Sequence, residues 1–171
     1  MELFKKIVLL LVLMLPLQMA AQTRFGYFSY KAVTDSLPDM IAASQSYETL
    51  KGKYAAEIKR TEDEFNRKYA DFLAGQKDFP QNILLKRQRE LQQLMEAGIA
   101  FRKDCDKQLA EAEKNIYAPV KDRIRMAVSA VGTEGGYDFI LDTDTNAFPY
   151  INAGRGEDLT EKIRAKLSAK D

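Results

Sequence analysis

Histidine and tryptophan are absent from this 171-residue sequence, and cysteine occurs once, at Cys105. Without histidine, the chain lacks the side chain most often used as a general base and as a zinc ligand. A single thiol cannot close an intrachain disulfide, so covalent bridges do not hold the fold together. No serine, lysine or pair of acids stands in a pattern that indicates a nucleophile beside its base. These absences argue against an enzyme and predict no cofactor and no metal.

The first 21 residues have the three-part composition of a secretory signal peptide. Lys5 and Lys6 precede an apolar run from Ile7 to Leu17, and Met19-Ala20-Ala21 supplies small residues at the end. The run is too short to span a hydrocarbon core of roughly 30 Å comfortably. We therefore expect export of the chain, with cleavage after Ala21.

Acidic and basic residues are almost balanced, at 25 and 26, which gives a formal net charge of +1. Removal of the leader takes away Glu2, Lys5 and Lys6, so the mature chain is neutral. A dedicated nucleic-acid binder needs a strong basic excess, so a nucleic-acid partner is not expected.

Two long stripes of apolar residues recur at three- and four-residue steps, which is the spacing of one helix face. Gly75 and Asp78-Phe79-Pro80 interrupt the pattern, as expected where one helix stops and another begins. The two predicted helices together take up most of residues 38–131, and helices that long cannot bury their stripes inside a small globule. We therefore expect an antiparallel, coiled-coil-like hairpin over residues 38–131. The first stripe contains Met40, Tyr47, Leu50, Tyr54, Ile58, Thr61, Phe65, Tyr69 and Phe72. The second contains Leu84, Leu91, Leu94, Gly98, Phe101, Cys105, Leu109, Ala112, Ile116, Val120, Ile124, Val128 and Val131.

The ends of the two helices have recognisable signals. Ser36 is expected to cap the first helix, with Pro38 and Asp39 in its first turn. The second helix is expected to kink at Pro119 and to end at Gly132 and Gly135-Gly136.

Short strands are predicted on either side of the hairpin. Arg24–Tyr30 is rich in aromatic residues, Tyr137–Asp142 alternates, and Ala147–Ile151 is a possible third strand. A last helix is expected from Asp158, with Glu161 completing a capping box. The fold class is therefore α+β. Three strands make a poor sheet alone, so residues 22–37 and 132–171 are expected to form a β-body with other protomers.

Four tracts carry a resemblance to a known family: Phe25-Gly26-Tyr27-Phe28, Ile116-Tyr-Ala-Pro-Val120, Gly136-Tyr-Asp-Phe-Ile-Leu-Asp142 and Asp158-Leu-Thr-Glu161. With the hairpin between them, they resemble the OmpH/Skp family of periplasmic chaperones over the whole mature chain. The resemblance implies an ATP-independent holdase that works in the periplasm. It also implies a homotrimer with a central β-body, whose helical arms enclose unfolded outer-membrane β-barrel proteins.

The resemblance and the stripes suggest two groups of interaction residues. Strand residues are the candidates for oligomerisation: Phe25, Tyr27, Tyr137, Phe139 and Leu141. Aromatic residues of the first stripe are the candidates for client binding: Tyr54, Phe65, Tyr69 and Phe72. Bulky rings could stay partly open to a client, or could fill gaps opposite small seam residues such as Gly98 and Ala112.

Basic residues gather where the chain reverses between the two helices: Lys77, Lys86, Arg87 and Arg89. Such a tip could meet acidic client stretches or anionic lipid headgroups, and it could equally be a solvated helix face. We include these four residues among the client-binding candidates.

Three features of the sequence allow another interpretation. The stripes and the leader also fit a structural coiled-coil envelope protein or a hairpin adaptor with one fixed partner. Asp142-Thr-Asp144-Thr-Asn146 copies the start of a calcium loop, but Ala147 and Ala153 stand where the loop needs glycine and an acid. A polar turn is therefore expected there. Cys105 lies on the second stripe and is expected to pack as a small apolar residue.

Overall fold

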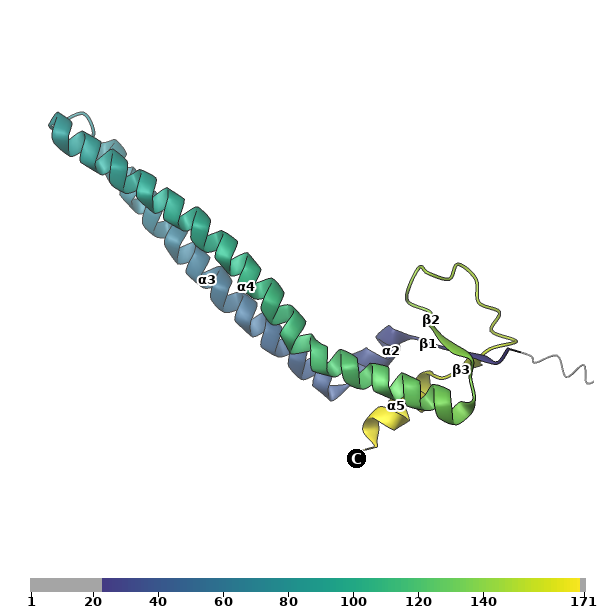
Figure 1. Cartoon of the computed structure of the whole chain (residues 1–171). Coiled ribbons are helices and arrows are strands. Elements are labelled where there is room, and N and C mark those ends of the chain that lie inside the picture. Colours follow the sequence, from purple (N-terminus) through teal and green to yellow (C-terminus); the bar gives the residue numbers. More distant parts are fainter. Residues whose placement is uncertain (1–22, 170–171) are drawn as a thin grey trace, which may run out of the picture. The chain divides into compact units, whose positions relative to one another are not determined.

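The computed structural model describes residues 23–169, so the predicted signal peptide lies outside the described residues. The elements, in chain order, are β1 (Phe25–Phe28), α2 (Tyr30–Asp35), α3 (Pro38–Gly75), α4 (Gln81–Gly135), β2 (Phe139–Asp142), β3 (Glu157–Asp158) and α5 (Thr160–Ser168) (Figure 1). Long helices with a small sheet confirm the α+β prediction. The described chain divides into two compact units, which we call the arm (residues 32–126) and the body (residues 23–31 and 127–169).

The start of α3 agrees with the prediction from the sequence, except for the residue that caps the helix. Pro38 occupies the first turn, where a backbone N–H would have no intrahelical acceptor, and Asp39 adds a carboxylate near the positive end of the helix. The N-cap is Leu37, without a side-chain hydrogen bond. The prediction that Ser36 caps α3 is therefore wrong. The Ser36 hydroxyl instead donates to the Val33 carbonyl at 3.4 Å, closing the turn that follows α2.

The break between the long helices is confirmed. α3 ends at Gly75, and the ring of Phe79 packs against this residue, where a Cβ would lie 2.6 Å from Cζ of the ring. The Pro80 carbonyl then accepts hydrogen bonds from the N–H groups of Ile83 and Leu84, both at 2.9 Å, and α4 begins. The chain therefore reverses within a few residues.

Contacts between α3 and α4 establish that the arm is an antiparallel hairpin (Figure 1). Partner numbers on α4 fall as those on α3 rise: Asp39 pairs with Arg123, the ring of Tyr47 lies 6.1 Å from that of Tyr117, and Glu62 pairs with Arg102. Every residue of the two predicted stripes within the arm is buried or half-buried except Tyr69. Each stripe therefore covers the other, as the sequence predicted.

The body contains a three-stranded parallel sheet with β1 at its centre, in the order β2-β1-β3. Phe25 pairs with Phe139 and Tyr27 with Leu141, so these four side chains share one face. Alternate residues on β1 are buried, as at Phe28. Alternate side chains of β1 point to opposite faces of the sheet, and one of these faces is covered.

The predicted strand at 147–151 is absent from the described structure of the body, and this prediction is wrong for the single chain. The third strand is instead β3, two residues long, which pairs with β1. Pro149 cannot donate a ladder hydrogen bond, and Phe148 and Tyr150 are 48% and 78% exposed. The segment therefore belongs to a long connection between β2 and β3.

α4 ends at Gly135, within the glycines that the sequence predicted as its end. Gly136 has a φ of +64°, and the Tyr137 N–H donates to the Gly132 carbonyl at 3.0 Å. The Gly136 N–H donates to the Thr133 carbonyl at 3.3 Å, which completes a Schellman cap. Gly132 serves packing instead, because a Cβ there would lie 3.3 Å from Cδ1 of Ile140. α4 is helical through Pro119, and the kink there stays a prediction.

The last helix also starts differently from the prediction. α5 begins at Thr160, after an N-cap at Leu159, and Asp158 belongs to β3. The Asp158 carboxylate still accepts a hydrogen bond from the Thr160 N–H at 2.9 Å. The Glu161 carboxylate pairs with Arg164 at 2.5 Å, so the predicted capping box is wrong.

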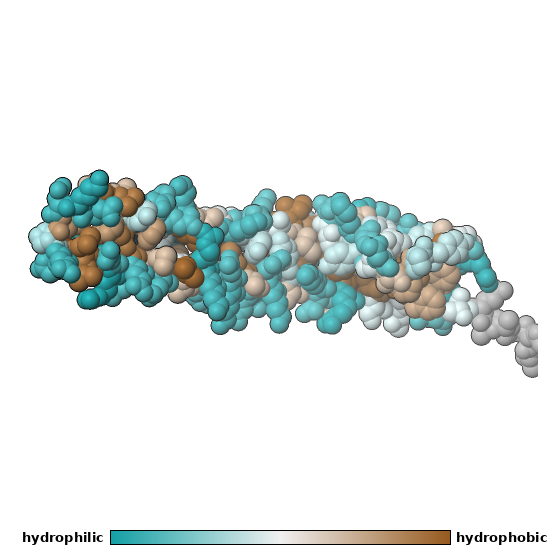
Figure 2. Space-filling model, turned by 90° about the horizontal axis from the view of Figure 1, so that it is seen from above, coloured by the Kyte–Doolittle hydropathy of each residue, from teal (hydrophilic) through white to brown (hydrophobic). Residues whose placement is uncertain are grey.

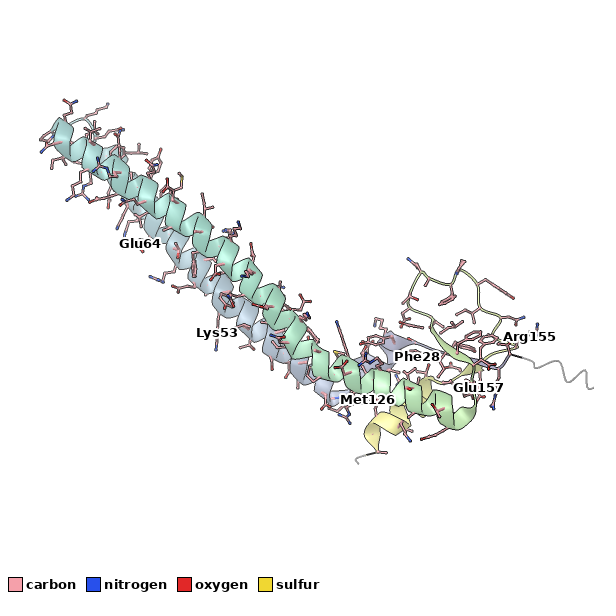
Figure 3. The ribbon with its side chains drawn as sticks, viewed as in Figure 1. Phe28, Lys53, Glu64, Met126, Arg155 and Glu157 are labelled. Atoms are coloured by element: carbon pink, nitrogen blue, oxygen red, sulfur yellow. The ribbon has the colours of Figure 1, made fainter. Side chains whose placement is uncertain are left out.

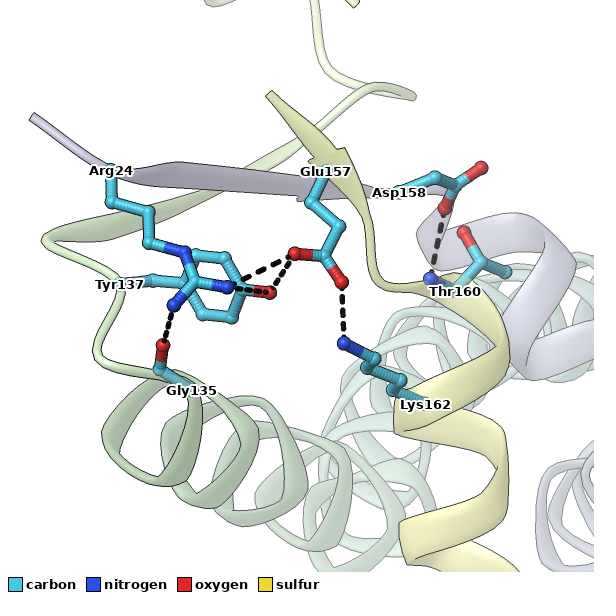
Figure 4. A network of polar contacts seen from close by, with 7 residues as sticks. All are labelled: Arg24, Gly135, Tyr137, Glu157, Asp158, Thr160 and Lys162. Atoms are coloured by element: carbon cyan, nitrogen blue, oxygen red, sulfur yellow. Dashed lines mark hydrogen bonds and ion pairs between the residues drawn. The ribbon is translucent and has the colours of Figure 1, made fainter. Parts of the chain in front are cut away.

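A network of polar contacts joins Arg24, β3 and α5 to the end of α4 (Figure 4). The Glu157 carboxylate accepts hydrogen bonds from Lys162 and Tyr137, and Arg24 lies 3.3 Å away. Arg24 also donates to the Gly135 carbonyl at 2.7 Å and stacks over the Tyr137 ring at 4.5 Å. The hydrogen bond from Lys162, followed by that from Tyr137, lowers the pKa of Glu157 from 4.5 to about 2.

This pKa predicts how the stability of the body depends on pH. A carboxylate whose pKa is lower in the folded state stabilises the fold above the unfolded value, and this stabilisation is lost as the pH falls. For Glu157 the window runs from about pH 4.5 down to about pH 2. We expect Glu157→Gln to be less stable at neutral pH and to lose stability less steeply across this window. Denaturant unfolding at a series of pH values measures both effects.

The matched control is Glu161→Gln, because this exposed carboxylate pairs with Arg164 three residues along α5. It should keep the pH dependence of the unmodified protein. Equal slopes for the Glu157 variant and the unmodified protein would contradict the assignment of the low pKa to this network.

Candidate functional site

Large apolar side chains remain exposed along the arm, among charged residues such as Lys53 and Glu64 that project from α3 (Figure 3). Figure 2 shows brown residues gathered among hydrophilic ones toward the end of the arm. The exposed large apolar residues of the arm are, in order of position, Ile41, Tyr69, Leu73, Ile83, Leu85, Met95, Ile99 and Met126, from 37% exposed at Ile83 to 64% at Ile99. The arm therefore offers apolar surface that its own seam does not cover.

Halfway along the arm, a pocket of about 380 Å³ opens between α3 and α4. We call it the mid-arm pocket. Its lining residues are Ile58, Thr61, Glu62, Phe65, Asn66, Leu94, Met95, Gly98, Ile99, Phe101 and Arg102. The volume lies within the range of ligand-binding pockets, and most of the lining is apolar.

The predicted aromatic client-binding residues fall in three different places. Phe65 lines the mid-arm pocket and stacks on Tyr69, with ring centroids 5.9 Å apart. Phe72 packs against Phe79 at 6.4 Å near the reversal of the chain. Tyr54 is half-buried in the seam, and Tyr69 is 45% exposed. The structure thus stacks Phe65 on Tyr69, whereas Phe72 packs on Phe79 and Tyr54 lies in the seam.

The basic candidates lie at the tip of the arm, as the sequence predicted. Lys77, Lys86, Arg87 and Arg89 are all exposed. Glu90 lies 3.7 Å from Lys86 and 3.5 Å from Arg87, so it offsets part of their charge. Arg87 also lines a smaller pocket of about 150 Å³ beside Phe72 and Phe79. The tip therefore combines positive charge with aromatic surface.

Four of the five oligomerisation candidates share one face of the body sheet. The rings of Phe25 and Phe139 stack with centroids 5.7 Å apart, and Tyr27 and Leu141 follow in register. Phe139 is 45% exposed. Tyr137 is the exception, because its hydroxyl and ring belong to the Glu157 network.

The acidic turn after β2 caps a helix, and this accounts for the residues that imitate a calcium loop. The Asp144 carboxylate accepts hydrogen bonds from the Lys31 N–H at 2.6 Å and the Ser29 hydroxyl at 2.9 Å. The Asp142 carboxylate accepts one from the Tyr30 N–H at 3.4 Å. These contacts satisfy the first N–H groups of α2, a helix that the sequence did not predict.

Residues 23–169 contain neither a membrane-spanning helix nor a cluster of metal ligands. No helix in this range is long and apolar enough to cross a membrane. No cluster of three or more potential metal-ligating side chains occurs within the same residues.

The residues that sequence reasoning missed are the exposed apolar side chains beside the seam. Ile41, Leu73, Leu85, Met95 and Ile99 each directly follow a stripe position. Adjacent helical residues are turned by about 100°, so such a residue lies on the flank of the hairpin. An apolar residue directly after a stripe member was the signal that could have found them.

These features define the class of protein: an α+β chain with a small parallel sheet and an antiparallel helical arm that exposes apolar side chains. A family model described as "Outer membrane protein (OmpH-like)" matches residues 24–167. The chain therefore belongs to the OmpH-like family, which confirms the resemblance noted in the sequence.

A crystal structure from Caulobacter crescentus CB15, described as that of an OmpH-like outer membrane chaperone, has the same fold. The TM-score is 0.69 at 18% sequence identity, and the match covers 85% of this chain and 83% of the other. None of the curated proteins compared with the chain matches it.

Proposed function

We propose that the protein is an ATP-independent holdase chaperone of the periplasm, which binds unfolded outer-membrane β-barrel proteins and prevents their aggregation. The observation that carries the proposal is the row of exposed apolar side chains along a charged helical arm. Unfolded barrel proteins expose apolar side chains and unpaired backbone groups, which drive aggregation. Scattered apolar contacts on an arm can cover such segments without selecting one sequence.

Membership of the OmpH-like family and the chaperone description of the Caulobacter protein support this proposal. Export by the predicted signal peptide would bring the chain to the periplasm. We propose that the bodies associate into a homotrimer through the sheet face that carries Phe25, Tyr27, Phe139 and Leu141. The partial exposure of Phe139 and the shortness of β3 support association of several chains.

The test is light scattering during size-exclusion chromatography of the mature protein, alone and with a β-barrel protein diluted from urea. We expect a trimer that elutes with the client in a soluble complex. A stable oligomer that leaves the client to aggregate would overturn the chaperone function and favour a structural hairpin or adaptor.

Charge at the tip gives a second prediction within this function. Changing Lys86, Arg87 and Arg89 to glutamate should weaken binding to anionic lipid vesicles at low salt by about tenfold or more, because each basic residue near such a surface contributes about 1 kcal/mol. Co-sedimentation with vesicles, with client binding measured in parallel, tests this. The matched control changes Lys103, Lys107 and Lys114 to glutamate. These residues are exposed on α4 away from the tip. Unchanged binding to both vesicles and client would mean that the tip charges only maintain solubility.

A further inference from the structure

Gly98 lies inside α4, where neither the backbone nor the packing requires a glycine. Its conformation is helical, and the positive φ among the described glycines is at Gly136. A Cβ added to Gly98 would lie 3.6 Å from Cγ2 of Thr61, which is ordinary van der Waals contact. Glycine is an unfavourable residue in a helix interior. Its effect at this position is to leave open the space of the mid-arm pocket.

The space beside Gly98 suits an aromatic ring. Phe65 and Phe101 line it together with the flexible, polarisable side chain of Met95. An apolar cavity of about 150 Å³ is large enough to hold benzene, and this pocket has about 380 Å³. Met95 and Ile99 line the pocket while remaining 48% and 64% exposed, so a ring can enter from solvent.

The rim of the pocket determines what should accompany the ring. Glu62 and Arg102 form an ion pair there, and Asn66 adds an amide. Together they offer hydrogen-bond donors and acceptors with no net charge. A chain with free backbone N–H and C=O groups matches this rim, whereas a ligand of one charge would gain no net electrostatic attraction from the ion pair.

We infer that the mid-arm pocket binds an aromatic side chain of an extended, uncharged polypeptide segment, and that Gly98 keeps the pocket open for it. The inference rests on the proposed function, because the segment would come from an unfolded client. It makes Gly98 a determinant of which client segments bind to the arm.

The chain has no tryptophan, so tryptophan fluorescence reports a bound peptide alone. The probe is an uncharged peptide of alternating valine and threonine with one central tryptophan, compared with the same peptide carrying alanine. With the full mature protein, we expect the tryptophan emission to move to shorter wavelength on binding. The alanine peptide should compete with it weakly.

Two substitutions close the pocket to different extents, and each has a matched control. Gly98→Leu fills the space, and Gly98→Ala reduces it while favouring the helix. The corresponding changes at Gly52 on α3 are the controls, because a Cβ there meets nothing within 4 Å. We expect Gly98→Leu to weaken peptide binding by about tenfold or more, Gly98→Ala to weaken it less, and both Gly52 variants to bind normally.

Equal peptide binding by the unmodified protein and both Gly98 variants would overturn the inference, as would equal binding of the alanine peptide. If circular dichroism shows that Gly98→Leu is unfolded, Gly98→Ala decides the question. Altered light scattering of the Gly98 variants with unaltered peptide binding would assign the pocket to a second copy of the chain and would also overturn the inference.

A client aggregation assay on the same proteins separates this inference from the proposed function. If the unmodified protein holds clients and the Gly98 variants bind peptide normally, the pocket inference fails alone. If the unmodified protein does not hold clients but peptide binding depends on Gly98, the holdase function fails and the pocket remains.

Discussion

Replacing Leu159 by alanine is expected to lower the free energy of unfolding of the body by about 2–5 kcal/mol. Leu159 has no exposed surface, and its N–H donates to the Tyr27 carbonyl at 2.8 Å. Its side chain fills the space above Gly26, where a Cβ would overlap its Cδ1 and lie 2.9 Å from its Cγ. Truncation would leave a cavity against the central strand, which the sheet cannot close without moving.

The reciprocal substitution gives a sharper test of this contact. Gly26→Ala should cost about 1–3 kcal/mol, because its methyl group overpacks against Leu159. In the double variant, the added methyl enters the space that the leucine vacates. We therefore expect the double variant to be more stable than the sum of the two single effects predicts.

Denaturant unfolding at one fixed protomer concentration measures these effects, because the proposed association of protomers would also contribute to stability. Phe148→Ala, at a side chain that is 48% exposed in the same unit, should change stability by no more than about 0.5 kcal/mol. Strict additivity of the Gly26 and Leu159 substitutions would show that these two side chains do not share one packing site.

Replacing Cys105 by aspartate is expected to destabilise the arm by at least about 3 kcal/mol, because it places an uncompensated charge in a buried site. Cys105 is 1% exposed in the seam. Burial raises the pKa of its thiol, and the charges of Asp104, Asp106 and Glu57 act in the same direction. A carboxylate at this position would face the same burial and the same like charges. Hydrogen exchange of amides along α4 and the loss of helical circular dichroism would report the effect.

The control for charge is Cys105→Ala, which removes only a small apolar group and should cost about 1 kcal/mol. The excess cost of the aspartate should shrink as the pH falls, because protonation removes the buried charge. An aspartate variant as stable as the alanine variant would mean that the seam opens to water at this position.

Much of the arm could be predicted from the sequence because its information is local and periodic. The stripes place Leu94, Gly98 and Cys105 on one face of a helix, and Gly75 with Pro80 locates the reversal. The aromatic candidates were located less well, since periodicity places Tyr54 and Phe65 on the same face but cannot say which ring adjoins a pocket. That depends on which residue of the opposite helix lies across the seam, as Thr61 lies across from Gly98.

The sequence by itself determined the long helical hairpin, the α+β class and the basic tip, because side-chain periodicity, turn residues and charge act over short distances along the chain. Only the tertiary structure decided that β3 rather than residues 147–151 completes the sheet, and that Gly132 packs against Ile140. It also decided that Glu157 gathers Arg24, Tyr137 and Lys162 around one carboxylate. The pairing of β3 with β1 and the contact of Arg24 with Glu157 join residues more than a hundred positions apart, which no local pattern specifies.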